Sequence, residues 1–221
     1  MRNYLFDTNA VVHYYTKEDH RIWRVLDHVI QQRVLKEAAL FIPSFCIVEV
    51  FNVFAKLRYE RKLSPVKYKQ FLDSFRKDLH WASIFYPYDL NRYHVLAADE
   101  IIPVEYAAPR EKRSDRSPAQ DRLSGIDILL IAMASELTYL YGNKTVFLLT
   151  GDSRIKRVCE HLRIHWTKDE EQSARIHRAL GQPNAQRWPV PTVFDLYHDS
   201  PFDLPTSDRQ KPLIPEPRGP S

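Results

Sequence analysis

The chain has 221 residues, of which 44% are hydrophobic, so it is long enough to bury one α/β core but too short for several large domains. Its 32 Lys and Arg outnumber 28 Asp and Glu, and the net charge of +4 mildly favours a polyanionic partner, although many soluble proteins are as basic. Cys46 and Cys159 lie in apolar helical patterns, which favours free thiols in a reducing compartment over a disulfide framework. The sequence has neither a signal-peptide pattern nor an apolar stretch of roughly eighteen residues, so we expect a cytoplasmic protein outside the membrane.

Short apolar runs alternate with helical patterns in the first hundred residues. The pattern predicts strands at residues 4–6, 40–42 and 84–86, and helices at residues 21–38, 44–61, 65–80 and 89–99. Pro43 and Pro87 are expected to close the second and third strands. Ser44 is then a candidate N-cap for the helix that follows Pro43.

The second half begins with a segment that lacks periodicity. Residues 103–122 combine prolines with several cations, which predicts a long polar loop. A helix from Ser124 is apolar on nearly every side, and a continuous apolar strand at residues 146–150 leads into a helix at residues 153–162. Residues 164–166 are a candidate edge strand. Strands separated by helices imply parallel crossovers, and hence an α/β three-layer sandwich with a central parallel sheet.

The composition changes beyond about residue 179, where nine of the fifteen prolines lie between Pro183 and the C-terminus. We therefore expect one domain over residues 1–168 and a Pro-rich extension over residues 169–221 that does not fold by itself. Its apolar residues could dock on the domain: Trp188, Val190, Val193, Phe194, Leu196 and Tyr197.

Two acids directly follow predicted strands. Asp7 comes after residues 4–6, and Asp152 comes after residues 146–150. Each has a structural alternative, because Asp is a common N-cap at a junction between a strand and a helix. Residues that follow neighbouring parallel strands meet at one edge of the sheet, so we expect Asp7 and Asp152 to face each other there.

Two further acids lie on predicted helices. Glu49 is surrounded in sequence by apolar residues, and unless it reaches solvent at the edge of its helix it needs a cation or hydrogen-bond donors; Asn52 is one candidate donor. Asp127 has the spacing of a capping box with Ser124. If these helices flank the sheet edge, all four carboxylates converge, and such a cluster is typical of a divalent-metal site.

The ordered motifs are similar to those of a known family. Asp7-Thr8-Asn9 after the first strand, Val48-Glu49-Val50 within a helix, Asp127 to Ala134, and Thr150-Gly151-Asp152 together resemble the PIN domain over roughly residues 1–168. Within that family the sequence resembles the VapC-type toxin ribonucleases of prokaryotic toxin–antitoxin pairs. The extra loop and extension favour the alternative of a stand-alone PIN nuclease. Another alternative is a non-catalytic nucleic-acid-binding or assembly module that keeps the fold.

The resemblance implies a metal-dependent endoribonuclease. Asp7, Glu49, Asp127 and Asp152 would be the catalytic residues and would coordinate one or two Mg²⁺ or Mn²⁺ ions for phosphodiester hydrolysis. It also implies an RNA substrate, a small antitoxin partner if the chain is a toxin, and a homodimer. The five glycines form no G-x-G-x-x-G or Walker loop, and no G-x-S-x-G occurs, so nucleotide binding of those kinds and serine hydrolysis are not expected.

Polar and basic residues near the acids are candidates for supporting roles. Five could hold the metal ligands by hydrogen bonds: Thr8, Asn9, Asn52, Thr150 and Ser153. Thr150 and Ser153 could equally cap a helix. Six cations could contact nucleic acid, three beside Asp152 and three in the loop, where they could equally be solvated: Arg154, Lys156, Arg157, Arg110, Lys112 and Arg113.

Overall fold

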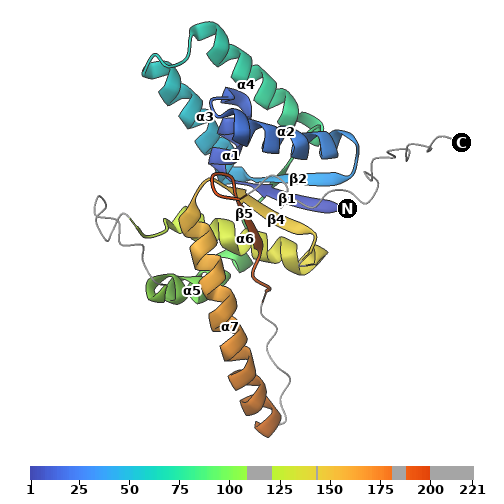
Figure 1. Ribbon diagram of the computed structural model, residues 1–221, viewed down its shortest axis with the longest axis vertical. Helices are drawn as coiled ribbons and strands as arrows, with labels where there is room; N and C mark the ends of the chain where they lie inside the picture. The colour runs from blue at the N-terminus through green and yellow to red at the C-terminus, as the bar shows by residue number, and fades with distance from the viewer. Residues whose placement is uncertain (109–120, 143, 181–187, 200–221) are drawn as a thin grey trace, which may run out of the picture.

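A computed structural model describes residues 1–108, 121–142, 144–180 and 188–199. Its centre is a five-stranded sheet in which every neighbouring pair of strands is parallel, in the order β3-β2-β1-β4-β5 (Figure 1). The strands are β1 (Arg2–Phe6), β2 (Ala38–Pro43), β3 (Phe85–Tyr88), β4 (Val146–Thr150) and β5 (Thr192–Asp195). The interior strands are short apolar runs because helices cover both of their faces.

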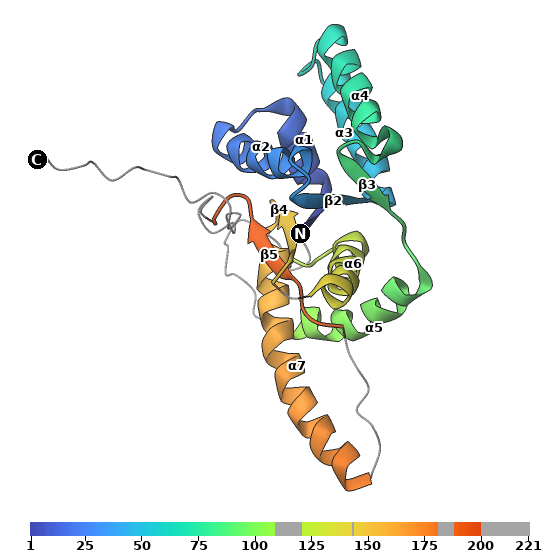
Figure 2. The same ribbon diagram turned by 90° about the vertical axis from the view of Figure 1, so that its right-hand side faces the viewer.

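One face of the sheet carries the helices of the N-terminal half. These are α1 (Thr8–Thr16), α2 (His20–Val34), α3 (Ser44–Tyr59) and α4 (Pro65–Leu79) (Figures 1 and 2). Their apolar stripes pack on the sheet in one core cluster, where Tyr4, Phe6 and Phe54 are fully buried. A 3₁₀ turn, η1 (His80–Ala82), links α4 to β3.

The opposite face carries α5 (Arg92–Ala107), α6 (Gly125–Tyr141) and the first half of α7 (Ser153–Leu180), which extends well beyond the sheet (Figures 1 and 2). A second core cluster lies here, to which α6 contributes several fully buried positions, including Ile131 and Met133. Helix layers on both faces confirm the expected α/β three-layer sandwich.

The strand order places a topological switch point between β1 and β4. The chain runs outward from β1 to β2 and β3 with helices on one face, then returns through α5 and α6 on the other face to β4. Phe6 pairs with Leu149 at the carboxyl ends of β1 and β4. In open α/β sheets, the crevice beyond the carboxyl ends at such a point is where ligands bind.

Several local predictions were wrong. Pro43, not Ser44, is the N-cap of α3, and the Ser44 hydroxyl donates to Asp89 instead. Pro87 lies within β3, which tolerates a missing N–H because β3 is an edge strand. The expected loop at residues 103–122 is helical as far as Ala107, since burial of Val104 against α6 outweighs the cost of Pro103.

The C-terminal part also differs from expectation. Residues 164–166 belong to α7, because Ile155, Cys159 and Trp166 are buried on one helical face. The fifth strand is β5, in the segment expected to dock on the body, where Phe194 and Leu196 are buried. The expected domain boundary at residue 168 therefore falls within a helix, and a strand beyond it completes the sheet.

Cys46 and Cys159 are free and buried, as expected. In the described part of the chain, none of the helices combines the length and the apolar character needed to cross a membrane.

Candidate active site

Asp7 lies at the carboxyl end of β1 and is both the N-cap of α1 and a buried acid, with 6% of its surface exposed. Its Oδ1 accepts from the Ala10 N–H at 2.6 Å, and its Oδ2 accepts from the Thr150 hydroxyl at 2.5 Å and the Gly151 N–H at 3.3 Å. Burial raises the pKa of Asp7 to about 6, and these hydrogen bonds only partly oppose that shift. The predicted role of Asp7 as a helix N-cap is thus confirmed. Capping alone does not explain its contacts with Thr150 and Gly151.

Thr150 connects the two strand ends. Its hydroxyl donates to Asp7 and accepts the Asp152 N–H at 3.0 Å, so one side chain contacts both acids. Asp7 and Asp152 therefore lie beside each other at the switch point, as their positions after adjacent parallel strands predicted. Thr150 was predicted to hold a metal ligand, and its hydroxyl contacts both of these predicted ligands.

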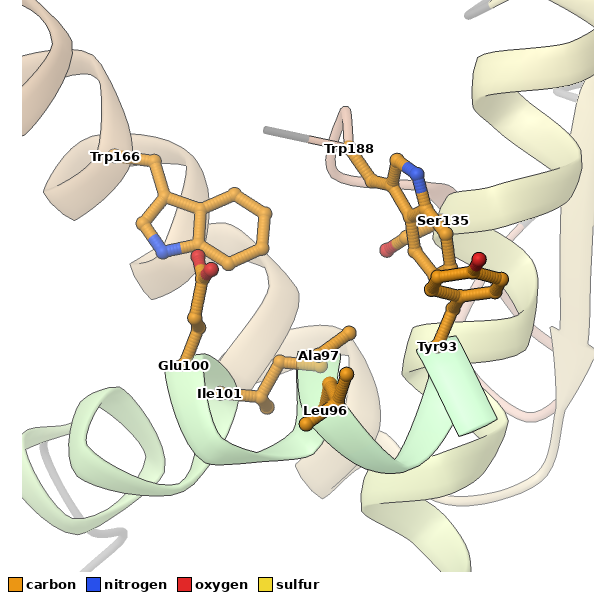
Figure 3. A pocket seen from close by; sticks show the side chains of 8 residues that line it. All are labelled: Tyr93, Leu96, Ala97, Glu100, Ile101, Ser135, Trp166 and Trp188. Atoms are coloured by element: carbon orange, nitrogen blue, oxygen red, sulfur yellow. The ribbon is translucent and has the colours of Figure 1, made fainter. Parts of the chain in front are cut away.

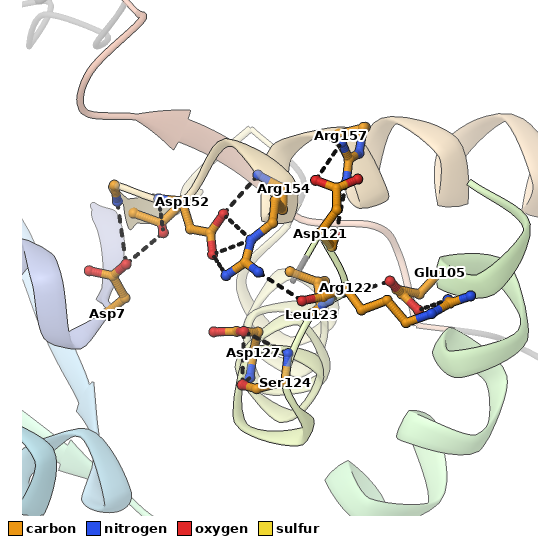
Figure 4. A network of polar contacts seen from close by, with 12 residues as sticks. Asp7, Glu105, Asp121, Arg122, Leu123, Ser124, Asp127, Asp152, Arg154 and Arg157 are labelled. Atoms are coloured by element: carbon orange, nitrogen blue, oxygen red, sulfur yellow. Dashed lines mark hydrogen bonds and ion pairs between the residues drawn. The ribbon is translucent and has the colours of Figure 1, made fainter. Parts of the chain in front are cut away.

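Arg154 binds the Asp152 carboxylate. Its Oδ1 accepts from the backbone N–H and from Nε of Arg154, both at 2.9 Å, and its Oδ2 accepts from Nε at 3.0 Å and Nη2 at 2.5 Å (Figure 4). Nη1 of Arg154 donates to the Arg122 carbonyl at 2.8 Å, which anchors the far side of the guanidinium. Arg154 was predicted to contact nucleic acid, but here it neutralises an acid of the site.

Glu49 is half buried on α3 and receives its hydrogen bond from the Thr8 hydroxyl at 2.5 Å, rather than from the expected donor Asn52. This bond joins α3 to the start of α1, directly after Asp7. Thr8 was predicted to hold a ligand of the site, and it does orient the Glu49 carboxylate.

Asp127 forms the capping box that its spacing with Ser124 predicted. Its Oδ2 accepts from the Ser124 N–H at 2.9 Å and from the Ser124 hydroxyl at 2.8 Å (Figure 4). Both bonds go to Oδ2, so this structural role is compatible with a ligand at the other oxygen.

The four acids line one cavity of about 320 Å³ at the carboxyl edge of the sheet. The other lining residues come from the starts of α1 and α6, from α3, and from the β4–α7 junction: Thr8, Asn9, Cys46, Asn52, Val53, Ser124, Ile126, Leu130 and Arg154. Four carboxylates and one guanidinium give this described lining a formal charge of −3 when all the acids are ionised. Asn9 and Asn52 thus lie where the sequence placed them, at the wall of the site.

The donor set suits a hard cation, because carboxylate oxygens are what Mg²⁺ and Mn²⁺ bind. The side chains are not yet gathered as ligands: no three His, Cys, Asp or Glu residues of the described ranges are close enough together to hold a metal ion. The Arg154 contact supplies a physical reason, since it occupies both oxygens of Asp152. The residue types suit a divalent metal ion, provided that the ion pair between Arg154 and Asp152 breaks.

The remaining predicted residues divide into two groups. Ser153 begins α7 but does not line the cavity, Lys156 pairs with Asp199, and Arg157 pairs with Asp121 at 3.1 Å. These two cations therefore bind acids of the chain itself. The loop candidates lie outside the described residues: Arg110, Lys112 and Arg113.

The segment after β5 was predicted to dock on the domain, but its place beside the Thr150-Gly151-Asp152 junction was not predicted. Tyr197, just after β5, lies against Gly151, where an added Cβ would come within 2.8 Å of the ring carbon Cε2. The Tyr197 hydroxyl is 2.6 Å from Nε2 of His13, and Arg21 donates to the carbonyl oxygens of Tyr197 and Asp199. The only signal was the glycine between Thr150 and Asp152, which does not reveal its distant partner.

Comparisons with known proteins add little to this geometry. No family model matches the chain, and no curated protein does. Among solved structures, VapBC2 from Rickettsia felis bound to a DNA fragment from its promoter is similar over 71% of this chain and 92% of that chain, with a TM-score of 0.45 and 16% sequence identity. At this level of identity the similarity says nothing about activity.

Proposed function

We propose that this protein is a metal-dependent endoribonuclease that hydrolyses RNA phosphodiester bonds in the cavity lined by Asp7, Glu49, Asp127 and Asp152. One observation carries the proposal: four acids from separate parts of the sequence line a single cavity at the switch point of a parallel sheet. Helix capping accounts for Asp7 and Asp127 individually, but it does not require them to share a cavity with Glu49.

In this proposal the chain holds the four carboxylates as ligands for Mg²⁺ or Mn²⁺. When bound, the metal would acidify a water molecule and stabilise the charge that develops on the phosphate oxygens. Thr150 and the Gly151 N–H hold one edge of Asp7, and Thr8 holds Glu49, so these hydrogen bonds orient two of the proposed ligands. Asn9 and Asn52, in the cavity wall, supply amide groups that can contact phosphate oxygens.

One specific observation favours the alternative of a non-catalytic nucleic-acid-binding module. Arg154 already places a positive charge beside Asp152, so this one acid is compensated without a metal. The two functions differ in what Arg154 must do: a nuclease requires it to release Asp152, whereas a binding module does not.

RNA cleavage decides between them. We expect labelled RNA to be cut by the full chain in Mg²⁺ or Mn²⁺, and cleavage to fall at least about a hundredfold in EDTA or in Asp7→Asn. Asp73→Asn, which removes an exposed acid on α4, is the matched control and should keep full activity. RNA binding that is unchanged by EDTA, with no cleavage under any condition, would establish the binding module instead.

The narrower proposal is that the nuclease is the toxin of a toxin–antitoxin pair, active in the cytoplasm as a homodimer with a small antitoxin protein as its partner. Its support is the likeness of the ordered acid motifs to VapC-type toxins. Induced expression in a bacterial host should arrest growth for the wild-type chain but not for Asp7→Asn. Normal growth with active enzyme in the cells would favour a stand-alone nuclease.

A further inference from the structure

A second cavity, of about 230 Å³, is shown in Figure 3. It is lined by residues of α5, α6, α7 and the segment before β5: Tyr93, Leu96, Ala97, Glu100, Ile101, Ser135, Trp166 and Trp188. Figure 3 shows the two tryptophans on opposite sides of the space, above an apolar floor from α5. None of these residues belongs to the acid cavity.

The aromatic walls are held in place by the fold. Trp166 is on α7 and only 8% exposed. Trp188 packs edge-to-face on His94, with ring centroids 5.9 Å apart, and His94 is itself fully buried. Nε2 of His94 lies 2.6 Å from the Glu136 carboxylate, which also accepts from Tyr88. This network fixes the side of the cavity that Trp188 forms, so the wall does not depend on a ligand for its position.

The polar residues of the described lining include Ser135 and Glu100. The Ser135 hydroxyl is 98% buried, and among the described residues its oxygen has no hydrogen-bond partner. A buried hydroxyl without a partner costs free energy, so its presence at the inner wall points to a ligand that would satisfy it. The Glu100 carboxylate lies next to the Trp166 ring (Figure 3), and the described lining contains no Lys or Arg.

We infer that this cavity binds a nucleobase, and specifically guanine. Indole rings are stacking surfaces for bases, and a described lining without Lys or Arg disfavours a phosphate group as the occupant. Guanine presents two adjacent donors, N1–H and the N2 amine, that match the two oxygens of a carboxylate. Adenine and cytosine present a donor beside an acceptor there, and uracil presents one donor between two acceptors. The Ser135 hydroxyl can donate to the O6 or N7 acceptor of the same base.

The position of the cavity relates it to the acid site. Ser135 follows Asp127 by eight residues on α6, which is about 12 Å along the helix axis. A single RNA strand can span that separation with a few nucleotides. A role in RNA cleavage rests on the proposed function: the cavity would then give the nuclease a preference for guanine near the cleaved bond. Binding of the base itself requires no catalysis.

Binding of free nucleotides tests the inference without cleavage. The full chain in EDTA is titrated with GMP, AMP, CMP and UMP, and binding is followed by calorimetry. We expect GMP to bind at least about tenfold more tightly than the other three, and Glu100→Gln to reduce that preference to less than about twofold. Glu160→Gln, an exposed acid on α7 outside the cavity, is the control and should change nothing.

Ser135→Ala provides a second variant that is expected to fold. Because it removes a buried group without a partner, it should not lower the melting temperature, but it should weaken GMP binding several-fold. Equal affinity for the four nucleotides would overturn the inference. So would the absence of saturable GMP binding, as expected if another segment of the chain fills the cavity. Metal-dependent cleavage without GMP binding would contradict only the guanine site. GMP binding without cleavage would contradict only the proposed nuclease activity.

Discussion

The guanidinium of Arg154 contacts both carboxylate oxygens of Asp152, two residues earlier in the chain, at distances of 2.5 to 3.0 Å. This pair lies in the wall of the cavity that holds Asp7, Glu49 and Asp127. An arginine so placed offers Asp152 the same charge compensation that a divalent ion would. Arg154 would therefore compete with the proposed metal ion for Asp152, and metal binding through this carboxylate would require the ion pair to break.

The first prediction follows from this competition. Arg154→Gln should lower the concentration of Mn²⁺ needed for half-saturation by about fivefold or more, because Asp152 no longer has to leave a cation before binding another. Calorimetric titration of Mn²⁺ into the metal-free protein measures this directly. Catalytic rate need not follow affinity, since a displaced Arg154 could also contact the phosphate.

Arg157→Gln is the matched control for that experiment. It removes an arginine of the same helix that pairs with Asp121 and does not line the cavity, so Mn²⁺ affinity should not change. Equal shifts in both variants would show that only net charge matters, and weaker Mn²⁺ binding in Arg154→Gln would contradict the competition.

The second prediction concerns pH. The pKa of Asp7 is raised by burial from 3.8 to about 6. Between these values the native state keeps a proton that the unfolded state has lost, so the free energy of unfolding falls as pH rises. This decrease in the free energy of unfolding is complete above about pH 6 and has not begun below about pH 4. A shift of this size corresponds to about 3 kcal/mol.

Asp7→Asn should remove this pH dependence in the presence of EDTA. The melting temperature of the variant minus that of the wild type should increase from pH 4 to pH 7 by on the order of 10 °C. Any loss of hydrogen bonds by the asparagine is the same at each pH and cancels from the trend. The difference for Asp73→Asn, an exposed acid, should stay nearly flat. If the melting-temperature difference for Asp7→Asn is also independent of pH, then burial does not raise the pKa of Asp7.

The third prediction is a coupling between Gly151 and Tyr197. Gly151→Ala places a Cβ within 2.8 Å of the Tyr197 ring, and tilting the ring away breaks its hydrogen bond with His13. We expect a loss of about 1–3 kcal/mol in the free energy of unfolding. In a Tyr197→Ala background the same substitution should cost less than about 0.5 kcal/mol, which a double-mutant cycle from urea unfolding measures.

Gly125→Ala controls for the effect of replacing a glycine. It lies in the first turn of α6 with open space around its added Cβ, so the substitution should stabilise the protein by about 0.4–1 kcal/mol. Equal costs for Gly151→Ala with and without Tyr197 would exclude the steric explanation.

The acids of the site were predictable from sequence because each depends on local rules. Asp7 follows an apolar strand, Asp127 completes a capping box with Ser124, and parallel pairing brings strand ends together. Their structural and functional interpretations proved to be compatible, since a helix cap uses only part of a carboxylate. The Arg154 contact was not predictable, because spacing alone does not tell whether a cation binds a neighbouring acid or the substrate.

The sequence predicted the fold class and most of the strands. The errors of that prediction lie where tertiary contacts override local sequence signals. Pro103 indicated a loop, but packing of α5 against α6 keeps the helix intact. The short apolar run at residues 164–166 resembled a strand until its place on the buried face of α7 was known. β5 was not predicted, because it lies in a Pro-rich segment and its extended conformation depends on pairing with β4, which the local sequence does not reveal.

The last prediction concerns that fifth strand. β5 pairs with β4 and buries Phe194, and the residue that follows the strand, Leu196, is also buried and donates its N–H to the Thr150 carbonyl at 2.9 Å, beside the acid site. A chain that ends at residue 199 should keep the melting temperature and activity of the full chain. A chain that ends at residue 180 exposes the β4 edge and should aggregate or lose several kcal/mol of stability.

Leu196→Ala tests the same contacts without truncation. It should cost about 2–5 kcal/mol in the free energy of unfolding, as expected for a buried leucine. Tyr197→Ala, at an adjacent but exposed position, should cost less. If the chain that ends at residue 180 is as stable and active as the full chain, then β5 is dispensable and the sheet is complete with four strands.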